Sequence, residues 1–116
     1  MNKKVNFWFL LILFFFYQNS FAQTQAEMNQ TAKKDFELAD AELNKVYKEV
    51  MKLLSEKEKQ LLIKAQRDWI KFRDSHCEFE ANEYEGGSIQ PLIYSSCLTE
   101  RTKNRIEDLK SIMKPK

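Results

Sequence analysis

The sequence predicts an all-α domain, built from an antiparallel hairpin of two long helices and a third helix that folds back over the hairpin. Three observations lead to this prediction. Apolar residues recur at steps of three and four through residues 28–113, which is the period of the α-helix. Gly86 and Gly87 are the only glycines and stand side by side, so no glycine interrupts the long runs before them. Cys77 and Cys97 are the only cysteines, and a disulfide between them would tie the third helix to the second.

Residues 1–22 have the composition of a secretory signal peptide. Two lysines precede an apolar run over residues 7–17, and small residues precede a cut that is expected after Ala22. A membrane anchor is the alternative interpretation, but 11 apolar residues fall well short of the roughly 20 that a spanning helix needs. We therefore expect a signal peptide followed by a periplasmic or secreted domain over residues 23–116, without membrane contact after cleavage.

The charge and the cysteine content narrow the class of partner. The chain has 19 Lys plus Arg and 17 Asp plus Glu, and the signal segment holds two of the lysines and no acid. The expected mature domain is therefore balanced at 17 charges of each sign, which gives no electrostatic basis for nucleic-acid binding. Export to an oxidising compartment favours a Cys77–Cys97 disulfide. Closing a loop of about 21 residues would contribute roughly 3 kcal/mol of stability in the chain-entropy model.

Capping sequences mark the start of the first two helices. Thr24 to Glu27 and Ser55 to Glu58 each have the spacing of a capping box, in which the first and fourth residues satisfy each other's free backbone N–H groups. We expect a first helix over residues 25–54, about 45 Å long at roughly 1.5 Å per residue. A second helix should run from residue 56 to the glycine pair. Its predicted apolar stripe consists of Leu61, Leu62, Ala65, Trp69, Phe72, His76, Phe79 and Tyr84.

The third helix is expected to begin at Ser88, whose side chain can cap it. Pro91 then falls in the first turn, where the missing N–H would have no partner in any case. Pro115 marks the end of this helix.

The short link at Ser55 makes the first two helices antiparallel neighbours, so that residues equally far from the link lie opposite each other. This register brings Arg73 close to Glu37 and Asp40. An arginine on an apolar stripe is buried cheaply only beside a carboxylate. We therefore predict a structural ion pair and prefer it to a binding role for Arg73. The same register sets Trp69 opposite Ala41 and Gln66 opposite Asn44.

The residues give no basis for catalysis or for a cofactor. The cysteines are better explained as a disulfide than as a nucleophile. His76 and Glu80, four residues apart on a helix, could share a metal ion, but two ligands do not make a site. Trp69 and Phe72 have the spacing of core residues rather than of a ligand platform. We therefore predict no enzyme activity, no cofactor and no metal site.

An acidic segment before the glycine pair is the candidate binding surface. Glu78, Glu80, Glu83 and Glu85 place four carboxylates within eight residues. A solvated helix face is the plainer interpretation, yet glutamates near a helix C-terminus oppose the helix dipole at a cost of roughly a few tenths of a kcal/mol. An acidic edge beside a glycine loop could dock into a basic protein cleft. The predicted partner-binding residues are Glu80, Glu83, Tyr84, Glu85, Gly86, Gly87 and Ser88.

Several of these residues together resemble a known family. The pattern comprises Asp40, Asn44, Tyr47, Gln66, Trp69, Arg73, Asp74 and Cys77, and continues in Gly86-Gly87-Ser88-Ile89 and Ser96-Cys97-Leu98-Thr99. It resembles the exported domain family of the LprI-type lysozyme inhibitor over nearly the whole expected mature chain, from about Thr24 to Lys110. The resemblance implies a small helical domain, secreted or periplasmic, that inhibits lysozyme and so protects the cell wall.

The chain departs from that family pattern in two respects. Many relatives carry two further cysteines early in the domain, one of them where Thr31 or its neighbour stands here. Lipoprotein members also have a lipid-attachment cysteine, which this chain lacks. These differences imply a single-disulfide variant with a freer first helix, in a form that is not anchored to lipid.

The sequence therefore predicts an exported protein that binds lysozyme, or a similar cell-wall hydrolase, and inhibits it by steric occlusion of the enzyme cleft. The alternative is a structural or adaptor module whose long hairpin pairs with another helical protein of the cell envelope. An apolar stripe left unpaired after the third helix has packed would favour this alternative. Helices longer than a compact domain of this size requires also leave association of two copies of the chain open.

Overall fold

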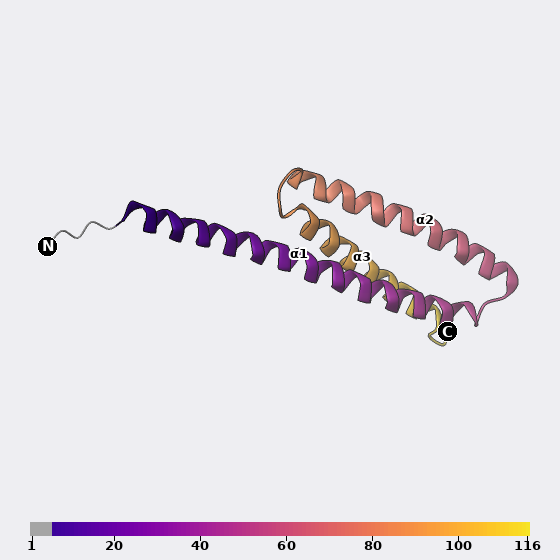
Figure 1. Ribbon diagram of the computed structural model, residues 1–116. Helices are drawn as coiled ribbons and strands as arrows, with labels where there is room; N and C mark the ends of the chain where they lie inside the picture. The colour runs from indigo at the N-terminus through magenta and orange to yellow at the C-terminus, as the bar shows by residue number, and fades with distance from the viewer. Residues whose placement is uncertain (1–5) are drawn as a thin grey trace.

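All the regular structure that the computed structural model describes is helical (Figure 1). The description covers residues 6–116, apart from the side chains of residues 17–23. The all-α prediction is confirmed. Helix α1 runs over Phe7–Met51, α2 over Glu56–Ala81 and α3 over Gln90–Ile112, and a short 3₁₀ helix, η1, follows α2 over Asn82–Tyr84.

The third helix is central to the packing. Figure 1 shows α2 returning antiparallel to α1, and α3 running beside α1 in the direction of α1. Helix α3 packs against both α1 and α2, and its contacts with α1 are the more extensive. The hairpin of α1 and α2 therefore encloses a core only together with α3.

Helix α1 begins at Phe7, after Asn6 in an extended conformation, and not at residue 25 as predicted. Neither Gly nor Pro stands between Phe7 and Met51, so nothing in the sequence stops the helix from propagating through Thr24. Thr24 is consequently not the N-cap of a helix, since its backbone lies inside α1. The expected cleavage point at Ala22 lies outside the residues whose side chains are described.

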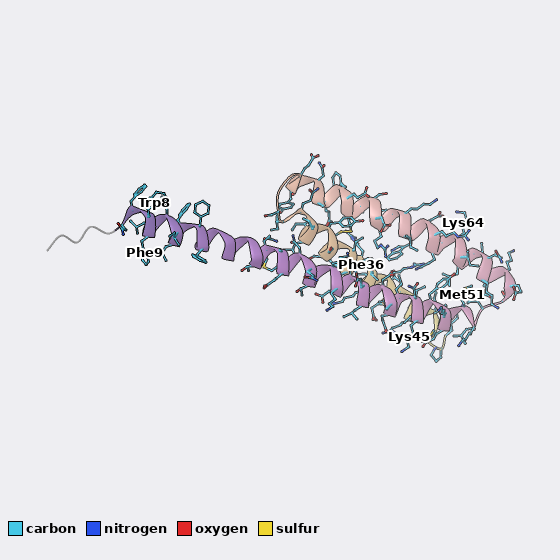
Figure 2. The ribbon with its side chains drawn as sticks, viewed as in Figure 1. Trp8, Phe9, Phe36, Lys45, Met51 and Lys64 are labelled. Carbon is cyan, nitrogen blue, oxygen red and sulfur yellow. A yellow bond between two sulfur atoms is a disulfide. The ribbon has the colours of Figure 1, made fainter. Side chains whose placement is uncertain are left out.

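The first turns of α1 project beyond the bundle. The molecule measures 87 × 24 × 18 Å, and Figure 2 shows Trp8 and Phe9 at the free end of α1, away from α2 and α3. Large apolar side chains over residues 7–16 are between 39 % and 76 % exposed. Among the described residues, no helix is long and apolar enough to cross a membrane.

The turn between α1 and α2 follows the sequence prediction closely. Helix α1 ends at Met51, three residues before the expected end, and the N–H of Leu53 donates to the carbonyl of Val50 at 2.9 Å. Ser55 is the N-cap of α2: its Oγ accepts from the N–H of Glu58 at 3.3 Å and donates to the Glu58 carboxylate at 2.9 Å. This cap fixes the start of α2 at Glu56.

The connection from α2 to α3 is partly as predicted. Gly86 has φ of +78°, the left-handed conformation that only glycine adopts without strain, so the chain reverses there as expected. Ser88 does not cap α3. Ile89 precedes the helix without a side-chain cap, and the Ser88 carbonyl instead accepts a hydrogen bond from Asn29 Nδ2 of α1 at 2.9 Å. Pro91 lies in the first turn of α3, as predicted.

The buried apolar residues form two clusters. The larger lies between α1 and α3, where Leu43, Val46, Val50, Ile106 and Leu109 pack together with Trp69 and Leu62 of α2 at its side. The smaller surrounds the disulfide, where Leu98 lies beside Cys77 and Cys97, with Phe36 and Tyr94 against them. Cys77 and Cys97 are bonded, with their Cα atoms 5.6 Å apart, so the predicted disulfide is confirmed.

The predicted apolar stripe of α2 is wrong along much of the helix, and its N-terminal members Leu61 and Ala65 are already exposed. Phe72 is 57 % exposed and Phe79 is 76 % exposed, whereas α2 buries Gln66, Arg73, Cys77 and Ala81. Cys77 must face α3 to form the disulfide. Phe72 and Phe79 lie on the other side of α2, so they face the solvent.

Candidate functional site

Arg73 joins the three long helices. It is only 7 % exposed. Its Nε donates to Asp74 Oδ1 at 2.9 Å, and its Nη1 lies 3.7 Å from Asp40 Oδ1 of α1. Nη1 also donates to Thr102 Oγ1 of α3 at 3.4 Å. A buried guanidinium with two carboxylates and a hydroxyl beside it is a structural arrangement, because it is shielded from any partner.

Aromatic rings complete the surroundings of Arg73. The guanidinium carbon lies 5.1 Å from the ring centroid of Phe36 and 5.2 Å from that of Trp69. Arg105 of α3 lies over the same Trp69 ring at 5.7 Å and donates from Nε to Gln66 Oε1 at 3.0 Å. Trp69 thus lies beside two cations, each held in place by hydrogen bonds.

The remaining motif residues are less closely linked. Tyr47 is partly buried against the larger cluster. Asn44, which the register set opposite Gln66, is exposed, while Gln66 is bonded to α3. Sequence reasoning did not single out Thr102 and Arg105. Thr102 and Arg105 follow Leu98 by four and seven residues, which puts them on the inward face of α3. Because their side chains are polar, the apolar pattern of the sequence does not mark them.

The predicted partner-binding residues gather at the end of the bundle where α2 becomes η1. A depression of about 530 Å³ is lined by Phe79, Glu80, Asn82, Glu83, Tyr84 and Ile93. Glu83, Glu85 and Glu78 are exposed and Glu80 is half-exposed, so their carboxylates are open to solvent. This is a shallow surface feature, suited to contact with a protein rather than enclosure of a small molecule.

The glycine loop beside this depression is held in place. The Gly87 N–H donates to the Tyr84 carbonyl at 2.9 Å, and the Ser88 carbonyl is held by Asn29 of α1. Gly86, Gly87 and Ser88 are all exposed. The loop is therefore an exposed but anchored tip of the bundle.

His76, the residue before Cys77 on α2, is linked to the acidic segment through Glu80. Its Nε2 is 2.9 Å from Glu80 Oε1 and 2.8 Å from Arg101 Nη2 of α3, and Arg101 Nη2 is 3.5 Å from the same Glu80 oxygen. When Nε2 carries a proton it donates to Glu80; when it does not, it accepts from Arg101. In the described part of the chain, no group of three or more histidine, cysteine, aspartate or glutamate side chains is arranged to hold a metal ion.

Three groups on or near α2, Lys64, Asp68 and Tyr94, have shifted pKa values. Burial raises the pKa of Tyr94, and the negative charges of Asp74 and Glu78 add to the increase. The hydrogen bond from Lys64 lowers the pKa of Asp68, which lies on the solvent side of α2 far from the acidic end.

Comparisons with known proteins identify the family. The family model described as lysozyme inhibitor LprI matches residues 18–109. A curated protein of Rhizobium meliloti (strain 1021), described only as uncharacterized, is 39 % identical over 105 residues, which cover 79 % of this chain and 76 % of that protein. No solved structure matches the chain. The family match spans the Arg73 motif, the disulfide and the glycine loop together, and the chain belongs to the lysozyme inhibitor LprI family.

Proposed function

We propose that this protein is an exported inhibitor of lysozyme, or of a similar wall muramidase, and that it acts by covering the enzyme cleft without chemistry of its own. Its family is one of lysozyme inhibitors. The observation that carries the proposal to a site is the depression at the end of α2, which Glu80 and Glu83 line, with Glu85 exposed in the turn that follows. A basic enzyme would be attracted to such an edge.

Export is part of the proposal. Residues 1–22 have the composition of a signal peptide, and the Cys77–Cys97 disulfide is the kind of bond that persists in oxidising compartments. Since lysozymes attack the wall from outside the cytoplasm, an inhibitor must be exported to meet them. We therefore propose a periplasmic or secreted domain that begins near Gln23.

The test is lysozyme activity on cell-wall substrate, titrated with the oxidised domain over residues 23–116 at low and at moderate salt. We expect dose-dependent inhibition that weakens as salt increases, because salt screens the attraction between exposed charges. The charge reversal Glu83→Lys with Glu85→Lys should weaken inhibition. The matched control is Glu42→Lys with Glu49→Lys, which makes the same change in net charge at exposed positions of α1.

Absence of inhibition by a folded, disulfide-bonded domain would contradict the proposal. Equal weakening by both charge reversals would show instead that net charge, and not the acidic end of α2, determines binding.

The alternative function is an adaptor that pairs with another helical protein. The exposure of Phe72 and Phe79 on α2 favours it, because these rings are left unpaired after α3 has packed. Helix pairing, however, needs apolar side chains repeated over several turns. The same face of α2 carries the exposed Leu61 and Ala65, but Asp68 and Ser75 interrupt it, so no continuous apolar seam runs along the helix. The inhibitor proposal is therefore the better supported.

A further inference from the structure

We infer that three side chains of α2, Phe72, His76 and Phe79, form the anchor through which this protein holds a basic partner, with cationic side chains of the partner against the rings. We call these residues the aromatic ridge. The inference rests on the proposed function, which it deepens by moving the main contact from the acidic end of α2 to the aromatic side chains on the outer face of the helix.

The exposure of the ridge is the first observation. Phe79 is 76 % exposed, more than any other large apolar side chain described after Phe16, and Phe72 is 57 % exposed. Exposed apolar side chains that stand singly need no explanation, but contiguous ones mark interaction sites. Here the rings are contiguous: the centroids of Phe72 and His76 are 5.5 Å apart, and those of His76 and Phe79 are 6.5 Å apart.

The ridge continues into an acidic depression. Phe79 is one of the residues that line it, together with Glu80, Glu83 and Tyr84, whose side chain is 40 % exposed. Glu80 of this depression is paired with Arg101, and Arg101 is also hydrogen-bonded to His76. Rings flanked by open carboxylates match a partner surface that presents lysine or arginine, because both the ring faces and the carboxylates attract cations.

The ridge is also rigid. It lies on a continuous helix, and the disulfide at Cys77, within the ridge sequence, fixes that part of α2 to α3. His76 is held between Glu80 and Arg101. Aromatic side chains on a fixed scaffold lose little entropy on binding, which is why such residues dominate the energetics of interfaces.

The glycine loop is a weaker anchor by comparison. Gly86 and Gly87 have no side chains, and the Ser88 carbonyl is already bonded to Asn29. The loop can exclude water from an interface, but it offers no side chain that fills a pocket.

The experiment measures binding of the oxidised domain, residues 23–116, to a purified basic c-type lysozyme by calorimetry. The variants are Phe72→Ala, Phe79→Ala and Phe79→Leu, with Leu38→Ala and Leu53→Ala as controls. Both control leucines are exposed, at 68 % and 65 %, and neither lies on α2. Since all these side chains are exposed, circular dichroism and melting should show each variant folded as the unmodified domain is.

We expect Phe79→Ala and Phe72→Ala each to weaken binding by about tenfold or more, and both leucine controls to bind as the unmodified domain does. Phe79→Leu should also weaken binding, because it keeps apolar area and removes the ring that attracts cations.

Four outcomes would overturn the inference. If the unmodified domain binds but the ridge variants bind equally well, the ridge is not the anchor and the proposed function stands. If ridge and control variants lose affinity equally, the contact is not specific to the ridge. If the unmodified domain does not bind, the proposed function fails and the inference fails with it. If the domain associates with itself and Phe79→Ala abolishes that association, the ridge binds a second copy of the chain, and the inference is again overturned.

Discussion

At the scale of single residues, Arg73 shows how one side chain can organise three helices. It is the buried cation between Asp40 of α1, Asp74 of α2 and Thr102 of α3, and its guanidinium lies against two aromatic rings. The carboxylates that neutralise it are less than half exposed, so their attraction is only partly screened by solvent. Arg73 therefore links the hairpin to α3 at a point that no apolar cluster occupies.

Replacing Arg73 should destabilise the fold. We expect Arg73→Ala to lower the free energy of unfolding by about 2–4 kcal/mol, because it removes the cation from between two carboxylates and leaves a space beside two rings. Arg73→Lys should lower the free energy of unfolding by less, since lysine keeps the charge although it lacks the planar guanidinium group. The exposed Arg67→Ala is the control and should stay within about 0.5 kcal/mol of the unmodified protein. Urea titration followed by circular dichroism measures all three; a harmless Arg73→Ala would contradict this assignment.

Tyr94 gives the protein an alkaline transition. Its pKa is raised above the ordinary tyrosine value of 10.0, mainly by burial against the disulfide cluster. The folded protein therefore holds this proton more tightly than the unfolded chain does. The stability that results is fully present below pH 10.0 and is lost as pH increases from there through the pKa of the folded protein.

The measurement for Tyr94 is tyrosinate absorbance and urea stability between neutral pH and pH 12. We expect one tyrosine to ionise above the others, and Tyr94→Phe to remove that step together with the part of the stability loss that it causes. If the ionisation at the highest pH persisted in Tyr94→Phe, another tyrosine would be the shifted one. Tyr84→Phe, at the exposed end, is the matched control.

At the scale of helices and turns, some local signals predicted the structure and others did not: the helix starts expected at Thr24 and Ser88 were wrong. The sequence predicts the Ser55 cap, the reversal at Gly86 and the Cys77–Cys97 bond, because each depends on neighbouring residues or on a single available pairing. It fails for the outer face of α2, since Phe72 and Phe79 have helical spacing and only the position of α3 decides which face is buried. The aromatic ridge was therefore hidden in what the sequence alone presents as core.

The same distinction applies to α3. Thr102 is fully buried and Arg105 lies over Trp69, yet both are polar and were not predicted to lie at the centre of the fold. Their roles follow from Arg73 and Gln66 on α2, which need hydrogen-bond partners once they are buried. A polar residue on the inward face of a helix can be recognised only when the group it satisfies is known.

The turn between η1 and α3 depends on one glycine. Gly86→Ala should lower the free energy of unfolding by about 1 kcal/mol. Gly86 has φ of +78°, and a side chain in that conformation is strained even where space is open. Gly86→Asn should cost less, since asparagine tolerates this conformation. Thermal melting of both variants tests the expectation. If alanine and asparagine were equally destabilising, the loss would come from something other than the backbone conformation.

At the scale of the whole molecule, the chain divides into a bundle and a projecting segment. The radius of gyration of 22.7 Å is far above the roughly 13 Å of a compact domain of this length. The projecting part of α1 causes this difference, and its apolar side chains are exposed over residues 7–16. The first core residue of α1 described as buried is Ala32, so the bundle proper begins well after the expected cleavage point.

Removing residues 1–22 should therefore leave the bundle intact. We expect a domain that begins at Gln23 to unfold at the same urea concentration as the full chain, because the described large apolar side chains that it loses, over residues 7–16, are exposed. A second truncation that begins at Lys33 removes Ala32 and the Asn29 hydrogen bond to Ser88, and it should unfold at a lower urea concentration. The steepness of the transition, which reports the surface exposed on unfolding, should change only in the second truncation. If the first truncation destabilised the protein as much as the second, residues 7–22 would have to pack on the bundle, and a bundle that depends on them would not survive cleavage after Ala22.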